Sequence, residues 1–182
     1  ALYLHWPFCR AKCPYCDFNS HVSNDVDSKI FGDALCTEMT HMASLMPSRP
    51  PLSSLFFGGG TPSLMPPILV ERLIRHAEDL FGFTGDIEIT AEANPTSVEA
   101  DAMLGFQKAG VNRVSMGVQS LDDASLKFLG REHSAADALH ALDKVKKAFD
   151  RVSIDLIYAL PDQSPKAWQD MLGQALSLGL GH

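Results

Sequence analysis

Three cysteines near the start of the sequence have the spacing of a metal-binding loop. Cys9, Cys13 and Cys16 lie within eight residues in the pattern C-x3-C-x2-C. This spacing lets one compact loop direct three sulfur atoms at a common centre, as cysteine-ligated iron–sulfur and zinc sites require. A structural zinc site has four protein ligands, whereas a cluster held by three thiolates keeps one iron open to an exchangeable ligand. The pattern therefore favours an iron–sulfur cluster.

Two other interpretations of these cysteines stay open. A zinc site could be completed by His5 or His21, both of which lie close in sequence. The cysteines could also be buried apolar residues or disulfide partners, although disulfide frameworks belong to small secreted chains with an even and denser cysteine count. The fourth cysteine, Cys36, lies inside a predicted helix and off its apolar stripe, so we interpret it as a small, half-buried residue rather than a ligand.

A glycine-rich motif follows the apolar run Ser53–Phe57, which we predict to be a strand. The motif is Gly58-Gly59-Gly60-Thr61-Pro62. Glycines at a strand end let backbone amides approach a polar ligand group that side chains would obstruct, although a simple turn has the same composition.

Two acids occupy related positions. Glu92 stands where the predicted strand Asp86–Ala91 becomes a loop, and Asp155 interrupts the apolar run Val152–Leu160. A carboxylate within an apolar strand needs a partner or a ligand, and an acid at the end of a barrel strand faces the site. Both are candidate ligand-binding residues, and the other interpretation of Glu92 is a solvated loop position.

The elements that would position these residues alternate regularly between strand and helix. The predicted strands are Leu2–Trp6, Ser53–Phe57, Asp86–Ala91, Asn112–Ser120 and Val152–Leu160. The predicted helices are Val26–Met46, Pro66–Phe81, Thr96–Gly110, Asp122–Gly130, Ser134–Phe149 and Ser164–Leu178. Alternation argues for a parallel α/β sheet, and polar insertions after every strand favour a (β/α) TIM-like barrel over a doubly wound sheet. About five βα units do not close a ring, so we predict a partial barrel with at least one further unit beyond His182.

Side-chain patterns define two of the helices more closely. The helix Val26–Met46 has an apolar stripe formed by Phe31, Leu35, Met39, Met42 and Met46. The helix after the third strand begins with Thr96 and Glu99 in a capping-box pattern and is closed by Gly110.

Composition limits the classes of function. The 182 residues are 46% hydrophobic and 20% charged, which is enough for one domain with its own core. A net charge of −7 argues against a non-specific nucleic-acid surface. No apolar run has the length of a membrane span and no signal peptide is evident, so four cysteines point to a reducing cytoplasm. The missing initiator Met and the abrupt ending are what we expect of an N-terminal fragment.

The run HWPFCRAKCPYCDFNSH resembles the cluster loop of radical S-adenosylmethionine (SAM) proteins. It is most similar to the branch that contains oxygen-independent coproporphyrinogen III oxidase and a radical SAM haem chaperone. The motifs FFGGGTPS, EANP, VSMGVQS, LGREH and IDLIYALPDQ follow in the same order as in that branch. The resemblance implies one radical SAM core domain over residues 1–182, and a [4Fe–4S] cluster on Cys9, Cys13 and Cys16 whose open iron chelates SAM. One electron from that cluster would cleave SAM to a 5′-deoxyadenosyl radical.

The resemblance also implies a SAM pocket. Its residues would be Tyr3, Tyr15, Gly59, Gly60, Thr61, Glu92, Gln119, Arg131 and Asp155. The sulfonium, amino acid, ribose and adenine of SAM need acids, hydrogen-bond donors and a flat apolar surface, which this set supplies. Arg131 could instead pair with Glu132, and we interpret His133 as structural.

One residue separates the two members of this branch. The oxidase usually continues its motif as C-x3-C-x2-C-x-C, whereas this chain has Phe18 at the last position. The resemblance therefore favours the haem chaperone, which binds haem as cargo, passes it to an acceptor protein and needs an electron donor for its cluster. Radical oxidation of a porphyrinogen propionate and a non-catalytic zinc domain stay open as alternatives. None of the seven histidines has a spacing that marks a haem ligand.

Overall fold

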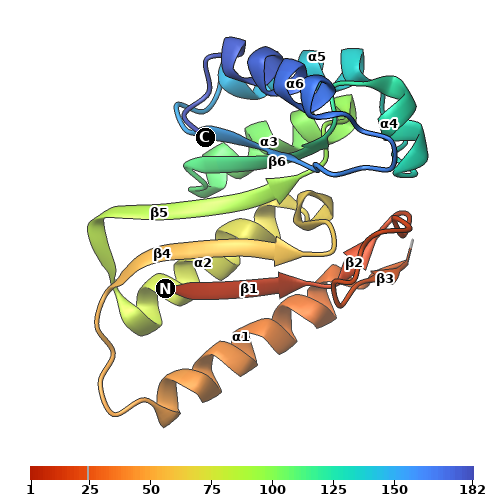
Figure 1. Cartoon of the computed structure of the whole chain (residues 1–182). Helices are drawn as coiled ribbons and strands as arrows, with labels where there is room; N and C mark the ends of the chain where they lie inside the picture. The colour runs from red at the N-terminus through yellow and green to blue at the C-terminus, as the bar shows by residue number, and fades with distance from the viewer. Residues whose placement is uncertain (24) are drawn as a thin grey trace.

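A parallel sheet of five strands organises the molecule (Figure 1). The computed structural model describes residues 1–23 and 25–182. The sheet strands are β1 (Leu2–Trp6), β4 (Leu52–Gly59), β5 (Phe83–Ala93), β6 (Arg113–Gln119) and β7 (Val152–Leu156). They lie side by side in chain order, and every pair is parallel. A doubly wound sheet would reverse its order at a switch point, so the sequential order confirms the predicted partial barrel.

The helices connect successive strands and cover the sheet. They are α1 (Ser28–Leu45), η1 (Pro62–Leu64), α2 (Pro67–Phe81), α3 (Ser97–Ala109), α4 (Asp123–Phe128), α5 (Ala135–Lys146) and α6 (Pro165–Ser177). Buried side chains from α1, α2, α3 and α5 form one hydrophobic core with the strands. No helix in the described residues is long and apolar enough to cross a membrane.

Strand β6 shows how the sheet separates core from site. Val114, Met116 and Val118 are buried in the core. Arg113 and Gln119 alternate with them on the other face and are only half-buried. Because successive side chains of a strand point to opposite faces, the polar residues of β6 face away from the core, and its carboxyl end delivers Gln119 to the edge where the motifs gather.

Several strand ends differ from the sequence prediction, and two of them concern site residues or the segment beside them. β5 continues through Glu92 and Ala93, because these residues pair with Ser115 and Met116 of β6, so Glu92 is a strand residue rather than a loop residue. β7 ends at Leu156 instead of position 160. Ala159 there has a left-handed φ of 60°, which an extended strand cannot contain.

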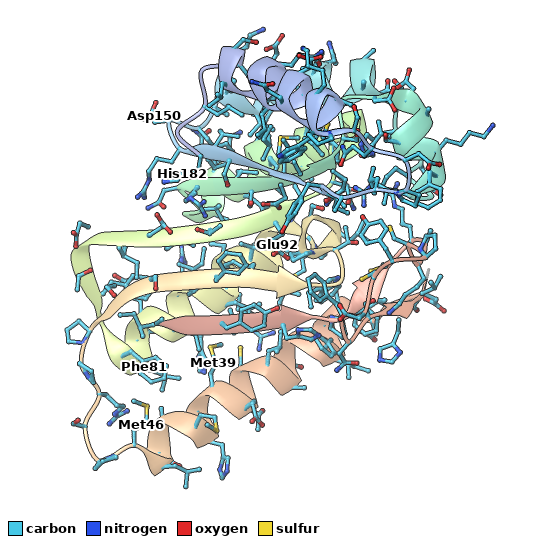
Figure 2. All side chains as sticks on the ribbon, viewed as in Figure 1. Met39, Met46, Phe81, Glu92, Asp150 and His182 are labelled. Atoms are coloured by element: carbon cyan, nitrogen blue, oxygen red, sulfur yellow. The ribbon has the colours of Figure 1, made fainter. Side chains whose placement is uncertain are left out.

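The apolar stripe predicted for α1 is shifted. The buried residues of the helix are Gly32, Cys36, Met39 and Ala43, whereas Met42 and Met46 are exposed. Met39 points from α1 toward the sheet in Figure 2. A Cβ at Gly32 would lie 2.5 Å from Leu69 Cδ1 of α2. Small residues therefore set the close approach of the two helices, and Cys36 belongs to the buried face rather than lying off it.

Candidate functional site

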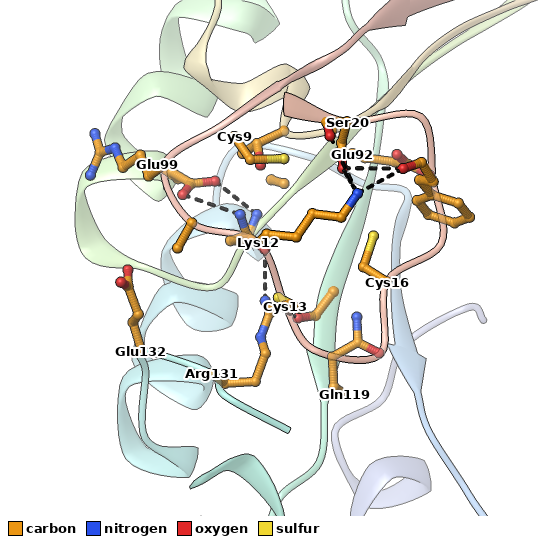
Figure 3. Close-up of a pocket in the computed structure, with 18 of the residues that line it drawn as sticks. Cys9, Lys12, Cys13, Cys16, Ser20, Glu92, Glu99, Gln119, Arg131 and Glu132 are labelled. Carbon is orange, nitrogen blue, oxygen red and sulfur yellow. Dashed lines mark hydrogen bonds between the residues drawn. The ribbon is translucent and has the colours of Figure 1, made fainter. Parts of the chain in front are cut away.

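One cavity at the carboxyl ends of the strands collects nearly all the predicted site residues (Figure 3). Eleven of the twelve line it: Cys9, Cys13, Tyr15, Cys16, Gly59, Gly60, Thr61, Glu92, Gln119, Arg131 and Asp155. Tyr3 is the exception. It lies on β1, where its ring stacks on Phe56 at 6.0 Å and its hydroxyl is 3.3 Å from His5 Nδ1. Burial, and then the charge of Glu92, raise the pKa of Tyr3.

The cysteine loop is closed by a pair of strands that the sequence did not reveal. β2 (Phe8–Cys9) pairs in parallel with β3 (His21–Val22). Inside the loop, Lys12 Nζ donates hydrogen bonds to the Phe18 carbonyl (2.9 Å) and the Ser20 hydroxyl (2.8 Å). These bonds hold the loop as a compact unit over the strand ends.

The three thiols of this loop are free and line one cavity. Cys36, the fourth cysteine of the chain, is also free. Within residues 1–23 and 25–182, no group of three or more His, Cys, Asp or Glu side chains is close enough together to hold a metal ion. His5 Nε2 is hydrogen-bonded to the Asn19 carbonyl at 2.8 Å, and His21 is exposed. In the described residues neither histidine is grouped with the three thiols as the fourth ligand that a structural zinc site needs.

The glycine motif serves close packing rather than free amide donors. The Gly60 amide donates to the Trp6 carbonyl (2.7 Å), and the Thr61 amide donates to the Phe8 carbonyl (2.9 Å). The Gly59 amide donates to the Glu92 carboxylate at 3.3 Å. A Cβ at Gly60 would lie 2.8 Å from both Cys9 Sγ and the Phe8 oxygen. The glycines thus let the cysteine loop pack directly against the end of β4, which corrects the expectation that their amides face a ligand.

Two carboxylates, those of Glu92 and Asp155, line the cavity. Burial raises the pKa of Glu92, against the effect of the Gly59 amide, and the negative charge of Asp155 adds to the rise. Partial burial also raises the pKa of Asp155, which accepts hydrogen bonds from the Ser115 hydroxyl at 3.2 Å. Neither acid forms an ion pair with another described residue. A cationic ligand would compensate both charges.

Arg131 joins the cysteine loop to the strand ends. Its Nη1 atom donates to the Tyr15 hydroxyl (3.3 Å) and Cys13 Sγ (3.5 Å). Its Nη2 atom donates to Asn94 Oδ1 (2.7 Å) and to the Gly117 carbonyl (2.9 Å). These partners replace the surface pairing with Glu132 that the sequence left open.

Gln119 has a backbone conformation that is unusual for its type. Its φ of 68° lies in the left-handed region, which costs a non-glycine residue on the order of 1–2 kcal/mol. The Ile157 amide donates to its carbonyl at 2.9 Å, so the strained turn is tied to the segment after β7. A Cβ at Gly117 would lie 2.8 Å from Gln119 Nε2. The absence of a side chain at Gly117 therefore leaves room for this amide, which lines the cavity.

Sequence reasoning left several residues that line the cavity out of the predicted site, among them Lys12, Asn94 and Glu99. Asn94 stands inside the EANP motif, and the spacing of Glu99 from Thr96 indicates only a helix cap. The Thr96 hydroxyl does accept from the Glu99 amide at 3.3 Å, but the Glu99 carboxylate binds Asn94 instead of returning to Thr96. His133 also lines the cavity: it is buried, with Nε2 3.2 Å from the Val118 carbonyl, and burial lowers its pKa.

Comparison with known proteins gives consistent matches over the whole chain. A family model described as the radical SAM superfamily matches residues 3–175. The chain is 42% identical to mouse radical S-adenosyl methionine domain-containing protein 1, mitochondrial, over 97% of this chain and 40% of that protein. It is 39% identical to the heme chaperone HemW of Escherichia coli, over 100% of this chain and 48% of that protein.

A solved structure agrees with these matches. The structure of the E. coli coproporphyrinogen III oxidase HemN, described as a radical SAM enzyme, superposes with a TM-score of 0.85 at 32% identity, over 99% of this chain and 42% of that one. The chain thus spans less than half the length of these relatives.

Proposed function

The chain belongs to the radical SAM superfamily, and on that premise we propose that it is the cluster- and SAM-binding part of a haem chaperone, which binds haem and transfers it to an acceptor. The observation that carries the first part is the convergence of three free thiols and two unpaired carboxylates on one cavity at the strand ends. That combination suits a soft metal cluster beside a cationic ligand.

The residues of the cavity would divide the binding work. Cys9, Cys13 and Cys16 would hold the [4Fe–4S] cluster. When bound, the cluster would supply the electron for reductive cleavage of SAM. Glu92 and Asp155 would accept hydrogen bonds from the amino group and the ribose hydroxyls of SAM.

Other predicted residues would complete the SAM pocket. Arg131 and Gln119 would donate hydrogen bonds to its oxygen atoms, and Tyr15 would offer an aromatic surface to the adenine. Gly59, Gly60 and Thr61 would shape the wall by the methionine end, and Tyr3 would support that wall from β1.

Phe18 favours the chaperone over the oxidase. The oxidase motif usually continues with a cysteine at this position, whereas Phe18 lines the cavity with an exposed ring. The 39% identity to HemW, a heme chaperone by name, supports the same choice. The structural likeness to HemN supports oxidation of a porphyrinogen propionate as the alternative.

The proposal includes partners that the cavity does not identify. A haem-accepting protein and an electron donor to the cluster are required by a chaperone of this kind.

We propose that the protein works in the cytoplasm, where reduced thiols stay available to metals. We also propose that the complete protein has at least one further barrel unit and a C-terminal domain.

Titration of the full-length protein with two tetrapyrroles tests this function. The protein is reconstituted anaerobically with iron and sulfide and is then titrated with haem and, separately, with coproporphyrinogen III. We expect stoichiometric haem binding and no decarboxylation. Conversion of coproporphyrinogen III together with release of 5′-deoxyadenosine would identify an oxidase. Binding of zinc without iron would favour the non-catalytic zinc-binding domain instead.

A further inference from the structure

Glu99 is a buried carboxylate beside the cavity, on the first turn of α3. Only 4% of the residue is exposed. Its Oε2 atom accepts hydrogen bonds from the Asn94 amide (2.8 Å) and the Ser63 hydroxyl, and Oε1 accepts one from Asn94 Nδ2 (3.4 Å). Within the described part of the chain it forms no ion pair. A buried carboxylate is costly unless its charge is compensated, and the amino end of α3 compensates only part of it.

Asn94 connects this carboxylate to a cation. The Oδ1 atom of Asn94 accepts a hydrogen bond from Arg131 Nη2 at 2.7 Å, while its Nδ2 atom donates one to Glu99. A carboxylate can only accept hydrogen bonds and a guanidinium can only donate them. The amide must therefore present its NH2 group to Glu99 and its oxygen to Arg131. The reverse orientation would set two acceptors against each other on one side and two donors on the other.

We propose that Glu99 is a positioning residue that acts through Asn94 to hold Arg131 over the cysteine loop. Figure 3 shows the Glu99 carboxylate and the Arg131 guanidinium in this hydrogen-bonded arrangement. The Ser63 hydroxyl fixes the other side of the Glu99 carboxylate to the segment after β4. One buried group thus ties the segments after β4 and β5 to Arg131. The inference rests on the proposed function only where SAM binding is its readout.

Two single substitutions and their combination test this chain of contacts. Glu99→Gln places an NH2 group against the NH2 group of Asn94, and an Asn94 side chain that turns to relieve the conflict meets Arg131 with the same NH2 group. Asn94→Asp places a second carboxylate against Glu99. In the double variant Glu99→Gln/Asn94→Asp, the new carboxylate accepts from both the new amide and Arg131. Both side-chain hydrogen bonds that connect position 99 through position 94 to Arg131 are then restored, and only the bond between positions 99 and 94 has its donor and acceptor exchanged.

The main readout is the SAM dissociation constant of the reconstituted full-length protein, with iron content measured alongside. Each single variant is expected to bind SAM about tenfold more weakly, about 1.4 kcal/mol, with unchanged iron. The double variant is expected to return to within about threefold of wild type. Asp101→Asn serves as the control, because this carboxylate is on the same helix but pairs with Lys144 at the surface. It should leave SAM affinity unchanged.

A second readout needs no ligand. In a crystal structure of the apo-protein, Glu99→Gln should move the Arg131 side chain off Asn94, and the double variant should return it. An unmoved Arg131, or a double variant that binds SAM no better than the weaker single variant, overturns the proposal. Wild-type protein that binds no SAM would instead refute the proposed function, and the crystal structures would still decide the positioning role.

Discussion

At the scale of single residues, burial of Glu92 in the cavity makes the stability of the fold depend on pH. Burial raises the pKa of Glu92 above its ordinary value of 4.5. The stability that this group contributes is present below pH 4.5 and is lost as the pH rises through the higher pKa of the folded protein. The folded protein therefore becomes less stable as this carboxyl group loses its proton, because burial disfavours the charged form.

Glu92→Gln tests the effect of this carboxyl group on stability and on SAM binding. We expect the apo-protein to gain free energy of unfolding at pH 7, because the amide has no charge to desolvate and can still accept from the Gly59 amide. The gain should shrink as the pH approaches 4, while SAM affinity at pH 7 falls roughly tenfold, as for the loss of a charged hydrogen bond. Urea unfolding across this pH range checks the first result and calorimetric titration with SAM the second. A gain that increases on acidification would contradict the account.

Gly60 is a second residue whose type the site dictates. Gly60→Ala places a Cβ 2.8 Å from Cys9 Sγ and from the Phe8 oxygen, and overpacking of this kind costs about 1–3 kcal/mol. We expect a lower melting temperature and poorer iron incorporation. Gly85→Ala is the matched control, since its Cβ would meet no atom within 4 Å. Equal effects of the two substitutions would show that packing against the cysteine loop is not the reason for Gly60.

At the scale of elements, α3 supports the site from the core. Its Phe106 is fully buried, whereas Phe128 of α4 is 62% exposed. Phe106→Ala is expected to lower the free energy of unfolding by about 3–5 kcal/mol, and Phe128→Ala by less than about 0.5 kcal/mol. Chemical denaturation of the two variants measures both. Similar losses would mean that α3 does not pack as the structure shows.

The same scale shows what sequence can predict. The alternation of elements predicted the parallel sheet, because the apolar periods of a helix and of a strand are both local properties of the sequence. The buried face of α1 was predicted only in part: Phe31, Leu35 and Met39 contact the core, whereas Met42 and Met46 are exposed. The burial of Gly32 was missed because it depends on Leu69 of α2, and no pattern within the helix reports a distant neighbour. The β2–β3 pair was missed because two-residue strands have no periodicity to detect.

The place of the site could be predicted from the sequence, but not the contacts of every residue in it. Glycines, acids and cysteines at strand ends marked the cavity, because the carboxyl ends of parallel strands meet at one edge. The role of Glu99 could not be read from its capping pattern, because its partners come from two other segments. The individual SAM contacts stay predictions.

At the scale of the whole molecule, the fold separates a hydrophobic core from the loop that carries the three thiols. The strands and helices share one core, while the three thiols belong to a loop that Lys12 and Arg131 hold over the strand ends. All three cysteines of this loop are free, and they line the same cavity. We therefore expect Cys13→Ala to fold like wild type but to hold no normal cluster, since its side chain lies outside the core.

Electron paramagnetic resonance of the reduced, reconstituted full-length protein tests the central claim most directly. The account predicts a [4Fe–4S] signal in wild type that changes when SAM is added, and no such signal in Cys13→Ala. A wild-type signal indifferent to SAM, or a normal cluster in Cys13→Ala, would contradict it.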